Sequence, residues 1–372
     1  MKEESPWIVP GPRSSSCARI ACSHIPFPMK ILTHTRRKFL KCLAGVPAGI
    51  WALAGDHTAS SAPLQNDEDV PISLASPSGG KVVVATNAAA TSGAGKPDGK
   101  EVARLLNDSV TAVTGKPDAR SAWKSLFAPG DVVGIKVNTL AGSGLSSHPE
   151  LVAAIVDALA AAGLPKERII VWDRFARELE AAGFTHAGVN GAKLLATDLV
   201  GIGYERDIEF SGEVGSCFSR ILSRMCTAII NVPVLKDHDL AGVSLGMKNF
   251  YGAIHNPNKY HDNNCDPYVA DLCAHSFVSR KLRLVVCDAL KGQYHGGPAA
   301  RPQWSWQAAT LIVGSDPVAV DRTGHEMIER KRKEAGMPSL TDVGREPKYI
   351  GTASRRGLGV GDLEKISRVL IS

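Results

Sequence analysis

Three lysines lie near the ends of apolar segments, where sheet proteins commonly place their binding residues. Lys136 and Asn138 are two residues apart at the end of one such segment, and Lys236 and His238 are two apart at the end of another. Residues two apart on a strand share a face, so each pair can point into one site. Lys248 follows in a segment flanked by glycines. Lysines gathered in one crevice repel each other unless an anion lies among them, which predicts a phosphate, carboxylate or sulfonate ligand.

The candidate residues of this anion site fall into two groups. The ligand-binding candidates are Lys136, Asn138, Asn231, Lys236, Lys248 and Asn249. The catalytic candidates are His238 and Asp288, either of which could carry a proton in an enzyme that acts on the anion. The competing interpretation is that each lysine is a solvated rim residue, since lysines are mostly exposed in folded proteins.

A second hypothesis is a metal or redox cofactor held by side chains between residues 238 and 265. His255, His261 and Cys265 are the candidate ligands, because imidazole and thiolate donors suit transition metals such as zinc, iron, nickel or copper. Their spacing matches no fixed frame such as H-E-x-x-H, so ordinary loop or core histidines are the competing interpretation. No C-x-x-C pair occurs, which argues against a zinc ribbon or an iron–sulfur cluster. A non-catalytic ligand-binding module is the third hypothesis.

Some polar residues have simpler structural interpretations. Asp316 precedes Pro317 and is expected to cap the helix that follows. Asp321 and His325 are four residues apart on that helix, a spacing that allows a side-chain pair. Beyond residue 54 the chain has five cysteines: Cys217, Cys226, Cys265, Cys273 and Cys287. The first two or the next two could form disulfides in an oxidising compartment, and buried inert thiols are the alternative.

The elements that must position these residues alternate between apolar, β-branched runs and helical segments. The predicted strands cover residues 81–85, 131–137, 168–172, 227–232, 282–287 and 309–313. The predicted helices cover residues 151–162, 176–182, 218–225 and 317–334, and Ser147 with Glu150 resembles a capping box before the first of them. This alternation predicts an α/β fold: a doubly wound, mostly parallel sheet with helices on both faces. A ligand then lies outside the carboxyl ends of the strands.

The charge of the chain is concentrated in its first 54 residues. The whole chain has 43 basic and 37 acidic residues, and residues 1–54 hold eight and two of these, so 35 of each remain. The balanced remainder gives no electrostatic reason to expect a nucleic-acid partner. No apolar run after the leader reaches the roughly 18 residues of a membrane span, so no stable membrane anchor is expected.

The leader itself has the features of a twin-arginine export signal. Arg36 and Arg37 stand before a short apolar run at 42–54, which ends in the A-x-A cleavage pattern. Residues 1–28 contain five prolines and no periodic pattern, and translation from Met29 would leave a normal basic leader. We therefore expect the twin-arginine export machinery as a partner and a periplasmic or other extracytoplasmic location.

The domain organisation predicted from these features has three parts. Residues 1–54 form the leader, residues 55–80 form a linker rich in Ala, Ser, Pro and Asp, and residues 81–372 form a single α/β domain.

Several segments of this domain resemble the family called domain of unknown function 362. The matching segments are GIKVN at 134–138, residues 231–252, CDAL at 287–290 with the Gly-Gly-Pro at 296–298, SDPVAVD at 315–321 and GLGVGDLEKI at 357–366. The resemblance spans about residues 81–370 and implies no defined activity. It places these residues in recurrent motifs: Lys136, Asn138, Asn231, Lys236, His238, Lys248, Asn249, Asp316 and Asp321. Relatives often carry a ferredoxin-type cluster module, whose cysteine run this chain lacks.

Overall fold

The computed structural model describes residues 79–92 and 95–372. The predicted twin-arginine leader and almost all of the predicted linker lie outside the described residues, and the domain boundaries stay a prediction.

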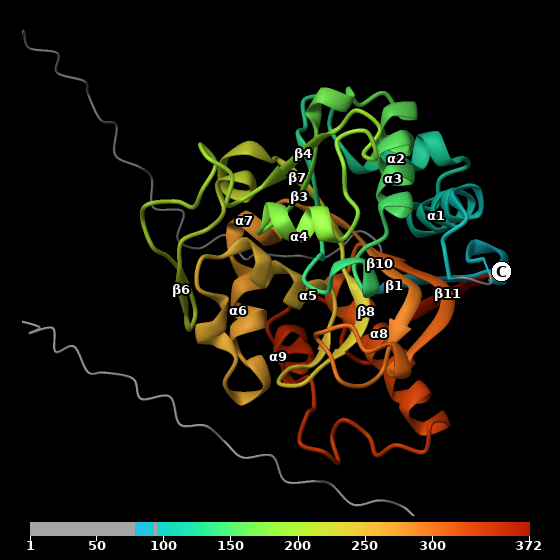
Figure 1. Cartoon of the computed structure of the whole chain (residues 1–372), viewed down its shortest axis with the longest axis vertical. Coiled ribbons are helices and arrows are strands. Elements are labelled where there is room, and N and C mark those ends of the chain that lie inside the picture. Colours follow the sequence, from blue (N-terminus) through green and yellow to red (C-terminus); the bar gives the residue numbers. More distant parts are fainter. Residues whose placement is uncertain (1–78, 93–94) are drawn as a thin grey trace, which may run out of the picture. The chain divides into compact units, whose positions relative to one another are not determined.

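A mixed sheet of ten strands, within the described residues, organises this part of the chain (Figure 1). Its main path runs β12-β1-β11-β10-β7-β2-β3-β4, with β8 beside β10 and β9 beside β8. Most pairs are parallel, and β11 is antiparallel to both of its neighbours. The strands are β1 Lys81–Thr86, β2 Val133–Val137, β3 Ile169–Asp173, β4 Lys193–Ala196, β7 Ala228–Val232, β8 Val234–His238, β9 Gly242–Ser244, β10 Leu282–Gln293, β11 Ser305–Gly314 and β12 Ser367–Ile371. A separate hairpin pairs β5 Glu209–Ser211 with β6 Val214–Ser216.

Helices cover both faces of the sheet, as Figure 1 shows for α1 to α3 and for α6, α8 and α9. Side chains alternate between the two faces, so neighbours such as Val82 and Val83 belong to different apolar cores. One core includes α1 Gly99–Thr114, α2 Ala119–Leu126, α3 Pro149–Ala161 and α4 Ala176–Ala181. The other includes α5 Gly246–Asn249, α6 Tyr268–Ala274, α7 Ser276–Ser279, α8 Pro317–Glu334 and α9 Lys348–Arg355. The predicted α/β fold class is therefore confirmed.

The predicted cap of α8 is confirmed, and the predicted cap of α3 is wrong. Asp316 accepts hydrogen bonds from the amides of Val318 and Ala319, which otherwise have no partner in the first turn. His148 occupies the cap position of α3 without a side-chain bond. Ser147 instead donates its hydroxyl to the Val232 carbonyl and accepts the Asn138 amide, so it joins the ends of β2 and β7.

Two predicted elements differ from the structure in type or length. The segment expected as a helix at 218–225 contains only a π-type turn at Ile221–Met225. The strand predicted at 282–287 continues to Gln293, because it pairs with β11 in a hairpin that extends past the parallel sheet. No helix in the described part of the chain is both long and apolar enough to cross a membrane.

The five cysteines of the described part are all free thiols, and four of them are buried. Burial raises the pKa of Cys226 to about 12 and raises those of Cys273 and Cys287. These thiols match the alternative of buried, inert cysteines rather than the disulfide pairings.

Candidate functional site

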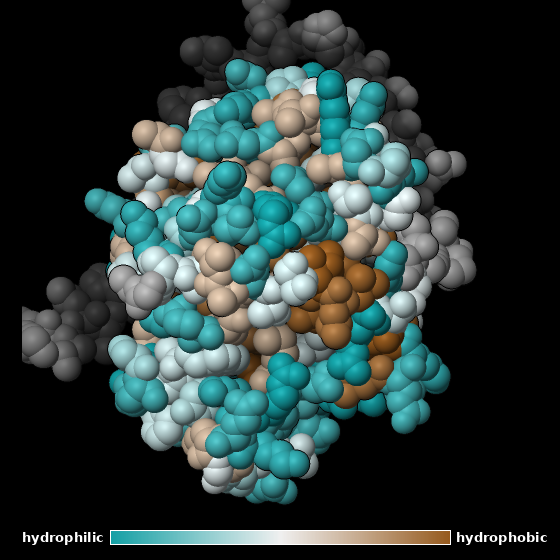
Figure 2. Space-filling view, turned by 90° about the vertical axis from the view of Figure 1, so that its right-hand side faces the viewer, coloured by the Kyte–Doolittle hydropathy of each residue, from teal (hydrophilic) through white to brown (hydrophobic). Residues whose placement is uncertain are grey.

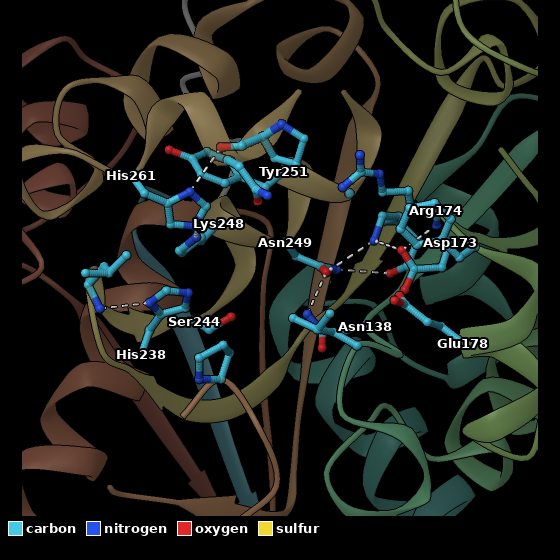
Figure 3. Close-up of a pocket in the computed structure, with 18 of the residues that line it drawn as sticks. Asn138, Asp173, Arg174, Glu178, His238, Ser244, Lys248, Asn249, Tyr251 and His261 are labelled. Atoms are coloured by element: carbon cyan, nitrogen blue, oxygen red, sulfur yellow. Dashed lines mark hydrogen bonds and ion pairs between the residues drawn. The ribbon is translucent and has the colours of Figure 1, made fainter. Parts of the chain in front are cut away.

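A pocket of about 450 Å³ opens at the carboxyl ends of β2, β3 and β8 (Figure 3). Its lining residues are Lys136, Asn138, Leu140, Asp173, Arg174, Phe175, Glu178, His238, Asp239, Leu240, Ser244, Lys248, Asn249, Tyr251, Gly252, Pro257, Asn258, His261 and Pro298. In Figure 3, His238, His261 and Lys248 lie on one side, Asp173, Arg174 and Glu178 on the other, and Asn138 and Asn249 between them. The strand-end location is the one expected for a ligand of a parallel sheet.

Lys136 forms an ion pair inside the protein. Its Nζ donates to Asp173 Oδ1 at 2.8 Å, to the Val137 carbonyl at 2.6 Å and to Asn249 Oδ1 at 3.2 Å. The second oxygen of Asp173 accepts the amide and the hydroxyl of Thr139. Since an ammonium has three protons, Lys136 has none left for an external anion. Lys136 therefore positions other residues of the pocket that it lines, and its direct contact with a ligand stays a prediction.

A chain of amide side chains connects Lys236 to the backbone of α5. Lys236 donates to Asn138 Oδ1 at 2.8 Å, and Asn138 donates to Asn249 Oδ1 at 3.1 Å. Asn249 donates to Asn231 Oδ1, which donates to the Gly246 carbonyl, both at 2.7 Å. Each amide both accepts and donates, so this network fixes its orientation. Asn231 and Lys236 are fully buried and lie behind the pocket lining.

Lys248 has a different environment, although it is almost as buried. Its Nζ lies 3.1 Å from His261 Nε2 and 4.1 Å from the centre of the Tyr251 ring. No carboxylate of the described residues forms an ion pair with it. Burial lowers the pKa of Lys248 to about 8, although Cys265 and Asp239 oppose this shift. Lys248 therefore presents to the pocket an ammonium group that loses its proton more readily than an exposed lysine does.

Lys236 adds a second labile charge just below the lining. Burial is the main reason that its pKa falls to about 8, and the charges of Lys248 and Lys136 lower it further. Asp173 and Asp237 act in the opposite direction. While both amines are protonated, their two positive charges make this region electropositive. An anion in the pocket would stabilise the charged form of each lysine.

The two histidines of the pocket are neutral and act as oriented hydrogen-bonding groups. His238 Nδ1 accepts the amides of Leu240 and Ala241, and burial followed by the Lys248 charge lowers its pKa to about 2. Its lone pair is therefore on Nδ1, and the nearby Asp239 carboxylate at 3.0 Å does not form an ion pair with it. His261 Nδ1 faces the Pro257 carbonyl, so its Nε2 accepts from Lys248. His238 thus offers an Nε2–H donor and is a poor proton carrier.

Asp288 lies outside the pocket lining. Its carboxylate accepts the backbone amide of His148 at 2.7 Å and lies 2.8 Å from Nδ1 of the same residue. Burial tends to lower the pKa of His148, but the charge and hydrogen bond of Asp288 outweigh it and raise that pKa. Asp288 therefore positions the start of α3.

The three metal-ligand candidates are not arranged as a ligand set. Within residues 79–92 and 95–372, no group of three or more His, Cys, Asp or Glu side chains could hold a metal ion. His261 lines the pocket and is engaged by Lys248, whereas the His255 ring packs edge-on against Tyr204. Cys265 is fully buried, and burial raises its pKa.

Asp321 was expected to pair with His325, but it holds α5 in place instead. Its oxygens accept the amides of Gly246 and Met247 at 2.7 and 3.1 Å. Burial raises the pKa of Asp321 to about 7 against the effect of these two bonds. His325 lies 3.4 Å from Glu329. The predicted pair is wrong, and the carboxylate anchors the segment that carries Lys248 and Asn249.

The pocket contains functional candidates that the sequence interpretation missed. Asp173 is the last residue of β3 and Arg174 follows it, so the strand-end rule could have found both. Glu178 lies on α4 and had no such signal. No described residue forms a hydrogen bond or ion pair with the Glu178 carboxylate, and burial together with the Asp173 charge raises its pKa. The Arg174 side chain is held by the Tyr204 hydroxyl and the His255 carbonyl.

The protein is thus an α/β protein whose pocket, rich in lysine and asparagine, lies at the strand ends. The family model described as Domain of unknown function (DUF362) matches residues 133–326, more than half of the chain, and the chain belongs to this family. A Thermotoga maritima protein of known structure is similar at 11% identity and a TM-score of 0.42, covering 64% of this chain. The match spans 59% of that protein's chain. No curated protein matches.

Proposed function

We propose that this protein binds a small organic anion in the strand-end pocket, with Lys248 as the main cationic contact. The supporting observation is the Lys248 amine, which lines the cavity between His261 and Tyr251 without an ion pair among the described residues. A buried ammonium without a counterion is unfavourable, and an anion entering the pocket removes that penalty. The His238 Nε2–H and the Asn138 amide, both in the lining, are further groups for an anion to contact.

Isothermal titration calorimetry with acetate, benzoate, citrate and inorganic phosphate tests this proposal. We expect Lys248→Met to weaken the affinity for the best of these anions about thirtyfold or more, since truncating one member of a buried charge pair commonly costs 2 kcal/mol or more. Lys333→Met, at an exposed position of α8, is the matched control and should bind normally. Absence of binding by every anion, or equal binding by the Lys248→Met protein, would contradict the proposal.

An enzyme that moves a proton on the bound anion is the second candidate, and the Glu178 carboxylate favours it. A pocket carboxylate with a raised pKa and no partner in the described structure is suited to proton transfer. Incubation of the protein with oxo acids in D₂O, followed by proton NMR, tests this function. Exchange of the hydrogens next to the carbonyl, lost in Glu178→Gln, supports it; exchange that persists in Glu178→Gln opposes it.

We further propose that the protein meets its ligand outside the cytoplasm after export by the twin-arginine machinery. Arg36 and Arg37 before a short apolar run support this proposal. Cell fractionation of the full chain should find the protein in the extracytoplasmic fraction. The double change of Arg36 and Arg37 to Lys should retain it in the cytoplasm, and unchanged location of that variant would exclude this route.

A further inference from the structure

The pocket is far larger than a simple inorganic anion requires. Its volume of about 450 Å³ equals that of roughly fifteen water molecules at ~30 Å³ each. It also lies within the range of ~300–1,000 Å³ that is usual for sites of organic ligands. A ligand that fills this pocket would therefore have a body in addition to a charged group.

Two leucines at the pocket are positioned to contact such a body. Leu140 follows the strand-end residue Asn138 by two positions, and Leu240 follows His238 in the same way. Both leucines line the pocket and are 57% and 50% exposed. Each strand end therefore contributes a polar group to the site and an apolar side chain that remains open to solvent.

The exposure of a leucine side chain does not by itself indicate a ligand site, because other leucines of this protein are exposed too. Figure 2 shows an apolar patch on the side of the molecule that carries the C-terminus in Figure 1, and Leu370 of the outer strand β12 is 78% exposed. Leu140 and Leu240 differ because they belong to a concave site with Phe175, Pro257 and Pro298. Covering such surface with an apolar ligand removes it from water and is favourable.

The charges of the site limit the charge of the ligand. The cationic lining residues Lys136, Arg174 and Lys248 are balanced in number by the carboxylates Asp173, Glu178 and Asp239. The two lining histidines are neutral, because burial and the Lys248 charge lower the pKa of each. Lys236, which reaches the site through Asn138, adds one positive charge. The excess of one charge matches a monoanion, and the three carboxylates would repel a phosphate dianion or citrate.

We propose that the ligand is a monocarboxylate with an aliphatic or aromatic body, whose carboxylate contacts Lys248 and whose apolar part covers Leu140 and Leu240. This inference rests on the proposed anion-binding function and specifies its ligand class. The polar groups orient the head, and the apolar walls select for the body.

Calorimetric titration of the folded protein with acetate, butanoate, hexanoate and octanoate tests the inference. Affinity should rise with chain length by up to about fourfold per methylene, the effect of ~0.8 kcal/mol for each buried CH₂. Hexanol and hexylammonium, which have a similar body without the negative charge, should bind at least tenfold more weakly than hexanoate. Inorganic phosphate and citrate should also bind more weakly than hexanoate.

Substitutions of the two leucines test whether they cause the rise of affinity with the chain length of the carboxylate. In the double variant Leu140→Asn and Leu240→Asn, the ratio of octanoate to acetate affinity should fall at least tenfold. Leu370→Asn, an exposed leucine outside the pocket lining, should keep the wild-type ratio. Circular dichroism confirms that each variant is folded before titration.

The outcomes separate this inference from the proposed function. Phosphate or citrate binding that exceeds hexanoate binding, and is lost in Lys248→Met, overturns the monocarboxylate inference and leaves the anion site intact. An affinity that does not change with chain length likewise overturns the monocarboxylate inference and leaves the anion site intact. Hexanol binding as tightly as hexanoate, with no effect of Lys248→Met, contradicts the proposed function itself.

Discussion

Lys136 and Asp173 bring two opposite charges into the interior, where their side chains are 1% and 7% exposed. Removing both charges from water is unfavourable, and their attraction offsets this only because each makes further hydrogen bonds. The Val137 carbonyl and the Thr139 hydroxyl supply such bonds. The pair therefore contributes less to stability than to the fixed positions of the groups around it.

Breaking this pair from one side should strongly destabilise the protein. Asp173→Asn leaves a buried ammonium without its counterion, and we expect a loss of about 3–5 kcal/mol in the free energy of unfolding. Urea denaturation measures this loss. The double change Lys136→Met and Asp173→Asn should be more stable than Asp173→Asn alone. Asp108→Asn, which breaks an exposed pair with Arg104 on α1, is the control and should cost below about 1 kcal/mol. Equal losses in Asp173→Asn and the control would contradict this account.

The protonation of Lys248 should control the pH dependence of anion binding. Its pKa is about 8 in the free protein, and a bound anion raises that pKa because it stabilises the charged form. Above pH 8 the ligand must therefore bind together with a proton, so affinity should fall as pH rises, by up to tenfold per unit. Titration calorimetry between pH 6 and 10 checks this. A weak residual affinity in Lys248→Met should decline less steeply, because only Lys236 then still loses its proton in this range, and a pH-independent wild-type affinity would contradict the prediction.

The residues of the pocket were partly predictable from sequence, for a simple geometric reason. Asn138, Asn231, Lys236 and Asn249 meet because the ends of parallel strands and the segment after them converge. Their roles were not predictable, since Asp173, which takes up the charge of Lys136, lies 37 residues away. Which lysine retains free donors depends on such distant partners and on burial, and neither is encoded in local spacing.

At the scale of elements, α5 is short and depends on a neighbouring helix for its position. It has only four residues, Gly246–Asn249, and no side-chain cap of its own. Asp321 of α8 accepts its first two amides. A short helix contributes little stability by itself, so this tertiary contact determines where Lys248 and Asn249 point.

Removing the anchor of α5 should therefore affect both stability and binding. Asp321→Ala leaves two buried amides without acceptors, and we expect a loss of about 2–5 kcal/mol in the free energy of unfolding. Anion affinity should also fall, because α5 can shift. Asp118→Ala removes an exposed cap on α2, and it should cost less stability than Asp321→Ala and leave the affinity unchanged. Denaturation and calorimetry of both variants measure these effects; normal binding by a destabilised Asp321→Ala protein would show that α5 holds its position without the carboxylate.

The central strands were easier to predict than the segments around them. Residues 81–85, 168–172 and 227–232 are apolar and β-branched because both faces of the sheet are covered, and these strands appear close to their predicted bounds. The continuation of β10 to Gln293 includes polar residues and depends on pairing with β11. Propensity in one segment cannot indicate a hairpin whose second strand begins twelve residues later.

At the scale of the whole molecule, the buried lysines should influence global stability in a pH-dependent manner. The pKa of Lys248 is about 8 when folded and near 10.5 when unfolded, so the unfolded chain binds this proton more tightly. Between pH 8 and 10.5 the stability contributed by this residue therefore rises with pH, by up to about 3 kcal/mol. Lys236 has the same direction of shift. Below pH 8 the full penalty of the buried charge is present.

The total stability will not display this rise directly, because other buried groups act in the opposite sense. The pKa values of Cys226 and Tyr251 are raised by burial, so these groups destabilise the folded state as the unfolded chain loses their protons. The difference between wild type and Lys248→Met isolates the lysine. In urea denaturation without ligand, we expect wild type to gain stability relative to Lys248→Met as pH rises from 8 to 10.5. A difference that stays constant over this range would mean that the Lys248 charge is solvated in the folded protein, which would also remove the electrostatic reason for an anion in the pocket.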